Sequence, residues 1–410
     1  MVDRKDGLFR YKSMTDRERK NLMIMDIIRR SGPVSRTEIS RITEINIVTI
    51  SNYINHYIEK GFVVEKGLDI STGGRKPTLL ELNDRGGYVV GVDIGPRDIR
   101  VVFTDLGVNV VTKKSIERPR GDMEEVTNSS LNLVQKVIDE SKVEKEKIRG
   151  IGLGISGIID DIAGTVRDTN NRRGKTSSSY ATLRMEAEKK FNIDAFVGND
   201  ATCAAYGEKR LTIEADVENM LYIYSDVGCG IIIKGEIYSG AGGSAGEIQL
   251  AIDQTGKGDL PLPSDELYYL RPLGVDLGMV QEAKNIISKG IGTKILELAK
   301  GQMDGIALEH IIKAAHEGDK IATDLIETAG IGLGTRVAYL INLFNPEVVI
   351  IGGGIERSGE LILESIKKAV RKLAFEEPAS RVRILPSGLG EDAVSLGAAC
   401  LVLREVFADI

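Results

Sequence analysis

Apolar residues recur at helical spacing near the start of the chain. In residues 17–31, RERKNLMIMDIIRRS, the side chains of Leu22, Met25 and Ile28 fall on one face of a helix. Gly32-Pro33 follows directly, and this pair ends a helix because proline lacks the amide hydrogen that another turn requires. The pattern therefore predicts a first helix over residues 17–31.

Two shorter helices are predicted next. Ser35, with Glu38 three residues later, matches the capping-box pattern at the start of the helix SRTEISRIT. The residues EINIV predict a turn, and TISNYINHYIEKG predicts another amphipathic helix that ends at Gly61. Two short helices joined by a brief turn are typical of a helix-turn-helix, which places its second helix in the major groove of DNA.

A hairpin with a basic tip follows the helices. FVVEKG and LDISTGGRKPTLLELN predict two strands with Gly73-Gly74 at the turn, an arrangement that suits a wing on phosphates or in a minor groove. The alternative is a small helical domain whose charged loop binds a protein. The candidate DNA contacts are Arg36, the short polar residues Thr49, Ser51, Asn52 and Asn55, which can reach base edges, and Arg75 and Lys76 beside the wing tip.

The pattern changes after Gly87 to strands that alternate with helices. YVVGVDIG, IRVVFTDLG and VNVVTKKSIER predict three successive strands, and a helix over about 122–142 precedes the buried strand of IRGIGLGISGIID. A helix near 180–190 and the strand of DAFVGND follow. Strands and helices then recur in NMLYIYSDVGCGIIIKGEIYSG, NPEVVIIGGGIERSG and VRILPSGLGEDAVSLGAACLVLREVF. This repetition predicts an α/β protein with two similar lobes, whose ligands bind in the cleft between them.

Charge and composition add to this division. Residues 1–83 have a net charge of +4 and the remaining residues have −10, so a polyanion is expected to meet only the first part. No apolar run reaches the roughly 18 residues of a membrane span, and the charged first residues do not form a secretory signal. Three well-separated cysteines predict free thiols in a reducing compartment. We expect a cytoplasmic protein without a membrane partner.

In sequence order, the motifs of the chain resemble those of the ROK family of repressors and sugar kinases. They are STGGRKPTLLELN, DIGPRDIR, GISGIID, GNDATCAAYGE, AGEIQ, NLFNPEVVIIGGGI and GAA, over about residues 20 to 400. The resemblance implies an N-terminal winged helix-turn-helix (residues 1–83), which only the repressor branch has, followed by a two-lobed actin-like ATPase (sugar kinase) fold of the α/β class (residues 84–410). The first lobe is expected over about 84–205 plus the C-terminal helix, and the second over about 206–390.

The resemblance implies a sugar site around Asp200. In the family, the aspartate at this position is the catalytic base, and the preceding asparagine, here Asn199, binds sugar hydroxyls. A cleft carboxylate at the end of a buried strand can take a proton from a hydroxyl during phosphoryl transfer. The structural alternative is a cap on the helix ATCAAYG. We favour a third interpretation, in which Asp200 binds sugar without catalysing a reaction.

Further sugar contacts are implied after the AGE motif. Glu247 matches a sugar-binding glutamate of the family, and a buried carboxylate can accept hydrogen bonds from two neighbouring hydroxyls. Gln249 stands where the family has a histidine that serves both sugar and zinc, and the following segment LAIDQTGKGDLPLPSDELYYL contains no cysteine. We therefore expect neither zinc nor another bound metal. Glu266 falls about where a further sugar-binding glutamate stands, with a solvated loop carboxylate as the alternative.

Two more segments match the family's sugar site. Gly154, Ser156 and Gly157, in GLGISGIIDD, fit a loop whose backbone approaches the sugar, although most relatives have proline where Ser156 stands. Asn171, or its neighbour Asn170, matches another sugar-binding asparagine. The stretch RRGKTSSSYAT that follows departs from the family's pattern, which is consistent with an altered or larger ligand.

The two loops that would hold ATP phosphates also depart from the family's kinases. In the hairpin VGVDIGPRDIR, Pro96 removes an amide hydrogen and Arg97 stands where relatives have threonine. In SDVGCGI, Asp226 and Val227 replace residues of Gly-Thr-Gly character, and a carboxylate there repels a polyphosphate. Nucleotide contacts, if there are any, would involve Gly95, Arg97, Gly228 and Gly353. The last of these lies in a Gly-rich turn that can equally serve strand–helix packing.

We predict a sugar-responsive transcriptional repressor without enzymatic activity. Its partners would be operator DNA at the N-terminal domain, a sugar or sugar derivative in the body, and further copies of the chain in a homodimer or homotetramer. The alternative is an ATP-dependent sugar kinase with an appended DNA-binding domain, which would use Asp200 as base and require Mg-ATP. A constitutive DNA-binding protein whose body only dimerises is a third interpretation. The identity of the sugar, its phosphorylation and the direction of the response stay open.

Overall fold

The computed structural model describes residues 14–68, 78–120, 122–160, 165–167, 178–225, 228–248 and 276–410. The chain divides into two compact units. The first unit comprises residues 1–168, 175–203 and 394–410, and the second comprises residues 169–174 and 204–393. Residues 1–83, named the head below, therefore belong to the same unit as the sheet that follows them. None of the helices in the described ranges has the length and apolar character needed to cross a membrane.

The head has the winged helix-turn-helix arrangement. Its helices are α1 (Asp16–Ser31), α2 (Arg36–Thr43) and α3 (Ile47–Glu59), and its strands β1 (Val34–Ser35), β2 (Val63–Leu68) and β3 (Thr78–Leu82) form a sheet in the order β1-β3-β2. The first helix matches the expected range closely. The third helix begins at Ile47, earlier than the predicted Thr49, because the Asn46 side chain accepts a hydrogen bond from the Val48 amide (2.8 Å) and caps it.

Caps also set the starts of the other two helices of the head. Ser35 accepts a hydrogen bond from the Glu38 amide (3.2 Å), as the sequence predicts. A complete capping box begins α1: Thr15 accepts from the Glu18 amide, and the Glu18 carboxylate accepts from the Thr15 amide (2.7 Å). Each cap satisfies amide groups that a first helical turn leaves without a partner in the helix.

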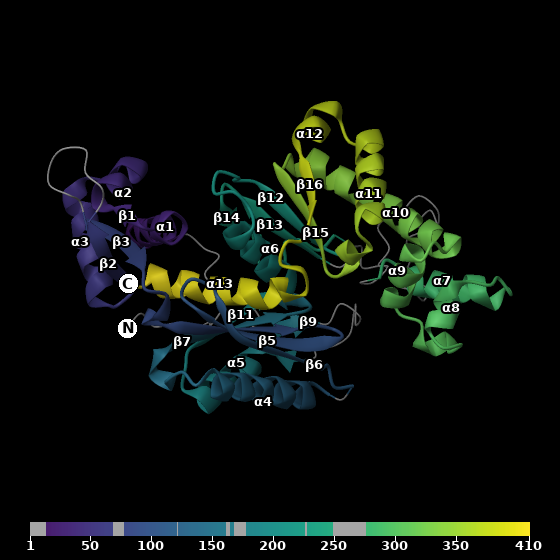
Figure 1. Ribbon diagram of the computed structural model, residues 1–410, viewed down its shortest axis with the longest axis horizontal. Helices are drawn as coiled ribbons and strands as arrows, with labels where there is room; N and C mark the ends of the chain where they lie inside the picture. The colour runs from purple at the N-terminus through teal and green to yellow at the C-terminus, as the bar shows by residue number, and fades with distance from the viewer. Residues whose placement is uncertain are drawn as a thin grey trace. The chain divides into compact units, whose positions relative to one another are not determined.

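The body of the first unit is built on a five-stranded mixed sheet (Figure 1). Its strands, in the order β11-β7-β4-β5-β6, are β11 (Ala195–Asn199), β7 (Ile148–Ile155), β4 (Tyr88–Ile94), β5 (Asp98–Asp105) and β6 (Val110–Glu117). Helices α4 (Met123–Ser141) and α5 (Tyr180–Phe191) share one apolar core with this sheet. A small sheet contains β8 (Ile158–Asp160), β9 (Thr165–Arg167) and β10 (Ser178–Ser179).

The last helix, α13 (Ala393–Ala408), lies along the other face of this sheet (Figure 1). Three glycines allow this close approach. A Cβ atom on Gly91 of β4 would lie 1.9 Å from the Ser395 carbonyl oxygen, and one on Gly152 of β7 would lie 2.5 Å from the carbonyl oxygen of Ala398. On Gly154 it would lie 2.5 Å from Val394. Strand and helix backbones therefore pack directly against each other at Gly91 and Gly152, and Gly154 makes room for the Val394 side chain.

The C-terminal end of α13 is packed against the head. The rings of Phe62 and Phe407 meet edge to face with centroids 5.9 Å apart, and both side chains are buried. Asn21 of α1 is completely buried, and its amide nitrogen donates to the carbonyl oxygens of Ala408 (3.0 Å) and Ile410 (3.2 Å). The hydroxyl of Tyr57 on α3 donates to the Asn21 side-chain oxygen (2.8 Å). A buried network that satisfies each of these polar groups holds the head to the first unit.

The second unit repeats the strand arrangement of the first. Its sheet has the order β14-β13-β12-β15-β16, with β12 antiparallel to β13 and parallel to β15, as β4 is to β5 and β7. The predicted two-lobe repeat is thus confirmed. The strands are β12 (Met220–Tyr224), β13 (Gly228–Ile233), β14 (Glu236–Ile237), β15 (Val348–Gly352) and β16 (Arg383–Pro386).

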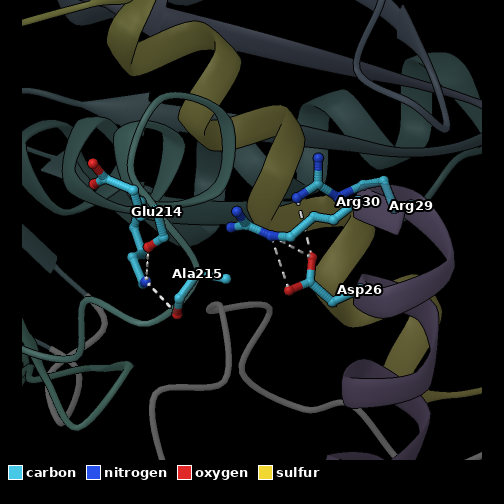
Figure 2. A network of polar contacts seen from close by, with 6 residues as sticks. Asp26, Arg29, Arg30, Glu214 and Ala215 are labelled. Atoms are coloured by element: carbon cyan, nitrogen blue, oxygen red, sulfur yellow. Dashed lines mark hydrogen bonds and ion pairs between the residues drawn. The ribbon is translucent and has the colours of Figure 1, made fainter. Parts of the chain in front are cut away.

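Helices of the second unit cover this sheet and extend beyond it. They are α7 (Met279–Ser288), α8 (Lys294–Leu298), α9 (Leu308–His316), α10 (Lys320–Phe344), α11 (Glu360–Leu373) and α12 (Glu376–Arg381). Most of them share one apolar core with β12 and β15. Helix α6 (Asp200–Leu211) begins in the first unit and continues in the second. At its far end the Lys209 ammonium donates to the carbonyl oxygens of Glu214 (2.9 Å) and Ala215 (3.1 Å), contacts drawn in Figure 2.

Candidate sugar site and candidate nucleic-acid interface

Four predicted sugar-site residues, Ser156, Gly157, Asn199 and Asp200, lie at the carboxyl ends of β7 and β11. Asn199 is the last residue of β11, and its side chain makes two hydrogen bonds within the protein. The oxygen accepts from the Thr202 amide (3.2 Å) and caps α6, while the nitrogen donates to the Gly157 carbonyl (3.0 Å). Gly157 has φ +130°, a conformation that favours glycine. Asn199, rather than Asp200, thus supplies the helix cap and ties the loop of Ser156 and Gly157 to α6.

Asp200 is the first residue of α6 and is only 5% exposed. Its carboxylate accepts a hydrogen bond from the Ala201 amide (2.7 Å). Burial raises the pKa of Asp200 to about 6, and hydrogen bonds from Ala201, Ser156 and Asn199 oppose this rise. A carboxyl group that titrates near neutral pH can accept a hydrogen bond from a sugar hydroxyl and can also act as a general base.

Asp93 is a further acidic residue near these strand ends, and it was not predicted as a site residue from the sequence. This buried aspartate lies near the end of β4, between β5 and β7 in the sheet. The pKa of the Cys203 thiol is raised well above its usual value, first by burial and then by the charges of Asp200 and Asp93. The charges of two acidic side chains therefore act on one buried thiol. The sequence could have indicated Asp93 as a site residue, because it stands near the end of an apolar run in YVVGVDIG.

The remaining predicted sugar contacts are only partly described. Glu247 is exposed, so the expectation of a buried carboxylate was wrong. Its turn is nevertheless well defined: Gly246 has φ +103° and accepts a hydrogen bond from the Cys229 amide (2.8 Å) through its carbonyl. Asn171, Gln249 and Glu266 lie outside the described residues. Across the part of the chain that the structure covers, no group of three or more His, Cys, Asp or Glu residues is placed to hold a metal ion.

The three glycines suggested for nucleotide binding have structural roles in this fold. The Gly95 amide donates to the Asp98 carbonyl (3.0 Å) inside the β4–β5 hairpin, and Arg97 is exposed at its tip. Gly228 pairs with Tyr224 at the start of β13. Gly353 has φ +82°, and a Cβ atom there would lie 2.4 Å from the Ser225 hydroxyl oxygen. Close packing therefore accounts for Gly353. Asp226 and Val227 lie outside the described residues.

The predicted DNA contacts fall into groups with different surroundings. Asn52 and Asn55 are exposed on α3, and Thr49 and Ser51 are half-buried. The guanidinium of Arg36 donates to the side chains of Asn55 (3.3 Å) and Glu65 (3.0 Å), and the Ser51 hydroxyl donates to the Ile47 carbonyl (2.8 Å). Arg75 and Lys76, which were predicted beside the wing tip, lie outside the described residues.

Several cations of the head are paired with its own carboxylates. Figure 2 shows Arg29 and Arg30, in the last turn of α1, both bound to Asp26 at 3.0 and 3.2 Å. Lys20 pairs with Asp16, and Lys66 pairs with Glu81 (2.8 Å). Ion pairs add nothing to the net charge of +4, so the positive charge that is free to meet phosphates comes from the other basic side chains of the head.

The head is a winged helix-turn-helix, and the body is a duplicated α/β domain. Together they define a class of protein that combines a DNA-binding type of domain with a sugar-kinase fold. The body's polar side chains gather at the ends of the parallel strands, where ligands of open α/β sheets bind. The chain belongs to the ROK family, whose family model matches residues 89–252 and 285–405.

Similar proteins share either the whole chain or only the body. A putative xylose repressor of Caldicellulosiruptor sp. (strain Rt8B.4) is 29% identical over 94% of this chain and 96% of its own. The N-acetylglucosamine repressor of Escherichia coli O157:H7 is 24% identical over 94% and 92%.

Among solved structures, a ROK family transcriptional regulator, a homologue of the Escherichia coli MLC protein, has a TM-score of 0.74 at 22% identity, over 96% of this chain and 97% of its own. A ROK family glucokinase from Streptomyces griseus has a TM-score of 0.64 at 26% identity. It covers 77% of this chain and 99% of its own.

Proposed function

We infer that the protein is a transcriptional repressor that responds to a sugar. The observation that carries this conclusion is the match along the whole length to proteins named as repressors, whereas the glucokinase leaves out about as much of the chain as the head occupies. The head would bind operator DNA through α3 and the wing. A sugar or sugar derivative, a pentose or an amino sugar by analogy with the named relatives, would bind at Asn199 and Asp200.

Glu247, Gln249, Glu266 and Asn171 are proposed to complete the sugar site, and Ser156 and Gly157 to contact the sugar from their loop. Asn199 has bonds inside the protein, so its share in binding would come from orienting this loop as well as from direct contact. Asp200 would accept a hydroxyl hydrogen. Its burial makes such a bond stronger than an equivalent bond at the surface.

The packing of the head against α13 supports a route for the response. Because buried contacts join Asn21 of α1, and Phe62 just before β2, to the C-terminal end of the chain, the head follows any movement of the first unit. Closure of the two lobes on a sugar would then shift the two heads of a dimer relative to each other. Operator half-sites have fixed spacing, so this shift would change the affinity for DNA.

Two-fold association is supported by a set of exposed apolar side chains in the second unit. Tyr339, Leu343 and Phe375 are each more than half exposed, and the Phe375 amide donates to Asn342 near the end of α10 (2.9 Å). Arg371, Lys372, Glu376 and Glu377 lie in the neighbouring sequence, so the surface has both charges and can complement itself. Sedimentation should show at least a dimer for the parent and a smaller species for Phe375→Asp. A monomeric parent would contradict this arrangement.

The experiment that tests the function uses the full chain. A duplex selected from a random-sequence pool serves as operator, and its affinity is measured with pentoses, hexoses and amino sugars in turn. We expect one sugar class to change operator affinity at least tenfold. Asp200→Asn should bind the same duplex without sugar but respond less. Failure to select any duplex, or affinity that no sugar changes, would contradict the proposal.

Asp200 is the specific observation that favours a sugar kinase as second candidate, because its raised pKa suits a general base. The same sugars are therefore incubated with Mg-ATP, and ADP release is measured. Release that depends on the sugar and is lost in Asp200→Asn would make the protein a kinase with a DNA-binding head.

A further inference from the structure

One face of α3 points away from the core of the head. Its residues Val48, Asn52, Asn55 and Glu59 are all exposed, at spacings of four, three and four, while Ile50, Ile54 and Tyr57 on the other face are buried. The exposed face therefore begins with an aliphatic residue. The side chain of Val48 is 65% exposed and lies in the first turn of the helix, two residues after the cap residue Asn46.

Local structure does not require valine at this place. Position 48 is exposed and adds little to the buried core of the head, and β-branched residues are less favourable in helices than alanine or the long polar residues. Asn46 supplies the capping oxygen, and Val48 contributes only its backbone amide to that bond. The two methyl groups of Val48 are thus presented to solvent without a role in the helix.

The polar groups along the same face differ in their availability. Asn55 accepts a hydrogen bond from Arg36, which also pairs with Glu65, and so its side chain is engaged inside the head. Among the residues that the structure describes, the side chain of Asn52 has no hydrogen-bond partner. Val48 and Asn52 are therefore the outward pair that a ligand can meet without breaking contacts inside the protein.

The chemistry of this pair matches adjacent positions in the major groove. Methyl groups pack against the C5-methyl of thymine, and an asparagine amide can bond N6 and N7 of adenine together. Side chains four residues apart on a helix have Cβ atoms about 5–6 Å apart, and base pairs are stacked about 3.4 Å apart. Contacts from the two residues would therefore fall on base pairs one or two steps apart.

We propose that Val48 is a specificity residue that recognises the methyl group of a thymine in each operator half-site, one or two base pairs from an adenine contacted by Asn52. This inference rests on the repressor function proposed above and adds a residue and a base to it. Val48 acts through apolar contact alone, so it should discriminate thymine from uracil, which pairs identically but lacks the methyl group.

The test uses the full-length protein and the duplex that it selects from a random-sequence pool. Each thymine of the duplex is replaced in turn by deoxyuridine, and binding is measured for the parent and for Val48→Ala. We expect the parent to lose about four-fold in affinity at one thymine in each half-site, the amount for one buried methyl group. Val48→Ala, which keeps only the Cβ methyl group, should lose less affinity than the parent when this thymine is replaced by uracil. Alanine is the better helix former, so this variant should fold.

Two controls make the result specific. Ile42→Ala removes another exposed aliphatic side chain, from α2, and should leave the sensitivity of the parent to uracil in place. In Asn52→Ala the loss caused by 7-deazaadenine, which lacks N7, should disappear at an adenine one or two base pairs away. If no thymine is sensitive in the parent, or if Val48→Ala keeps the same sensitivity, the proposal is wrong. If no duplex is selected, the repressor function itself fails.

Discussion

Asn199 and Asp200, two adjacent residues at the end of β11, have different roles. Asn199 uses both ends of its side chain to cap α6 and to hold the loop of Gly157, whereas Asp200 is buried with its carboxylate held by the next amide. From the sequence pattern alone, Asp200 could either cap helix α6 or contact a ligand. The hydrogen bonds assign the cap to Asn199, and Asp200 is left as the group whose protonation can respond to a ligand.

Asp200 makes stability depend on pH. Its pKa in the folded protein is about 6, above the value of 3.8 for a free aspartate, so the folded state binds its proton more tightly than the unfolded state. The resulting stabilisation is complete below pH 3.8 and is lost as the pH rises through 6. Asp200→Asn should therefore be more stable than the parent at pH 8, by at most about 3 kcal/mol, with a smaller difference at pH 4.5.

Urea unfolding at the two pH values measures this difference. Asp304→Asn serves as the control: its side chain is fully exposed and its contact with Lys284 is long (3.9 Å), so its replacement should change stability much less than Asp200→Asn at pH 8. Equal effects of pH on Asp200→Asn and on the parent would show that Asp200 does not titrate in this range.

Part of the candidate sugar site could be predicted from the types of residue and their order in the sequence. The strand that ends at Asn199 and the helix that begins at Asp200 were both predictable, because an apolar run precedes polar residues there. The exposure of Glu247 was not, since burial depends on contacts made by distant segments. The role of Gly154 was also hidden: its partner Val394 lies 240 positions away in the sequence.

At the scale of elements, the close contact between α13 and the sheet depends on glycines in the strands, which have no side chain. Gly91 and Gly152 lie on neighbouring strands and face the backbone of the same helix. The order of strands and helices was predictable from periodicity. The pairing of the last helix with this sheet was not visible in the pattern, because an apolar helix can cover either sheet. The family resemblance supplied that expectation.

Gly91→Ala tests this packing. The new methyl group would lie 1.9 Å from a backbone oxygen, which cannot rotate away, so α13 must shift from the sheet. We expect a loss of about 3 kcal/mol in the free energy of unfolding, measured by chemical denaturation.

Gly332→Ala is the matched control, since a methyl group in that part of α10 meets no atom within 4 Å. Alanine should stabilise the helix by about 0.5–1 kcal/mol. Similar stability of Gly91→Ala and the parent would show that the helix does not press on β4 as described.

At the scale of the whole molecule, the contact between Phe62 and Phe407 can be used to test whether sugar binding in the body is coupled to operator binding by the head. Phe407→Leu removes the edge-to-face ring contact but keeps an apolar side chain, so we expect a loss of about 1–2 kcal/mol in stability. The variant should bind sugar as the parent does, while the effect of sugar on operator affinity falls several-fold. Titrations of sugar with and without operator should show the same reduction, because coupling is reciprocal.

Phe191→Leu is the matched control for this variant. Phe191 is equally buried in the core of the first unit but belongs to α5, away from the head. It should lose comparable stability and keep the full response to sugar. If both variants keep the response, the signal does not pass through the end of α13.

The position of α13 in the chain also bears on how the protein is made. The sheet of the first unit and the head are synthesised early, but the helix that covers one and braces the other follows the 190 residues from 204 to 393. At about 5–20 residues per second, a ribosome needs roughly 10–40 s to reach it. A nascent or truncated chain therefore carries a head without its brace. Until α13 is made, the Phe62 ring and the Asn21 amide of the head lack the contacts that hold them in the finished protein.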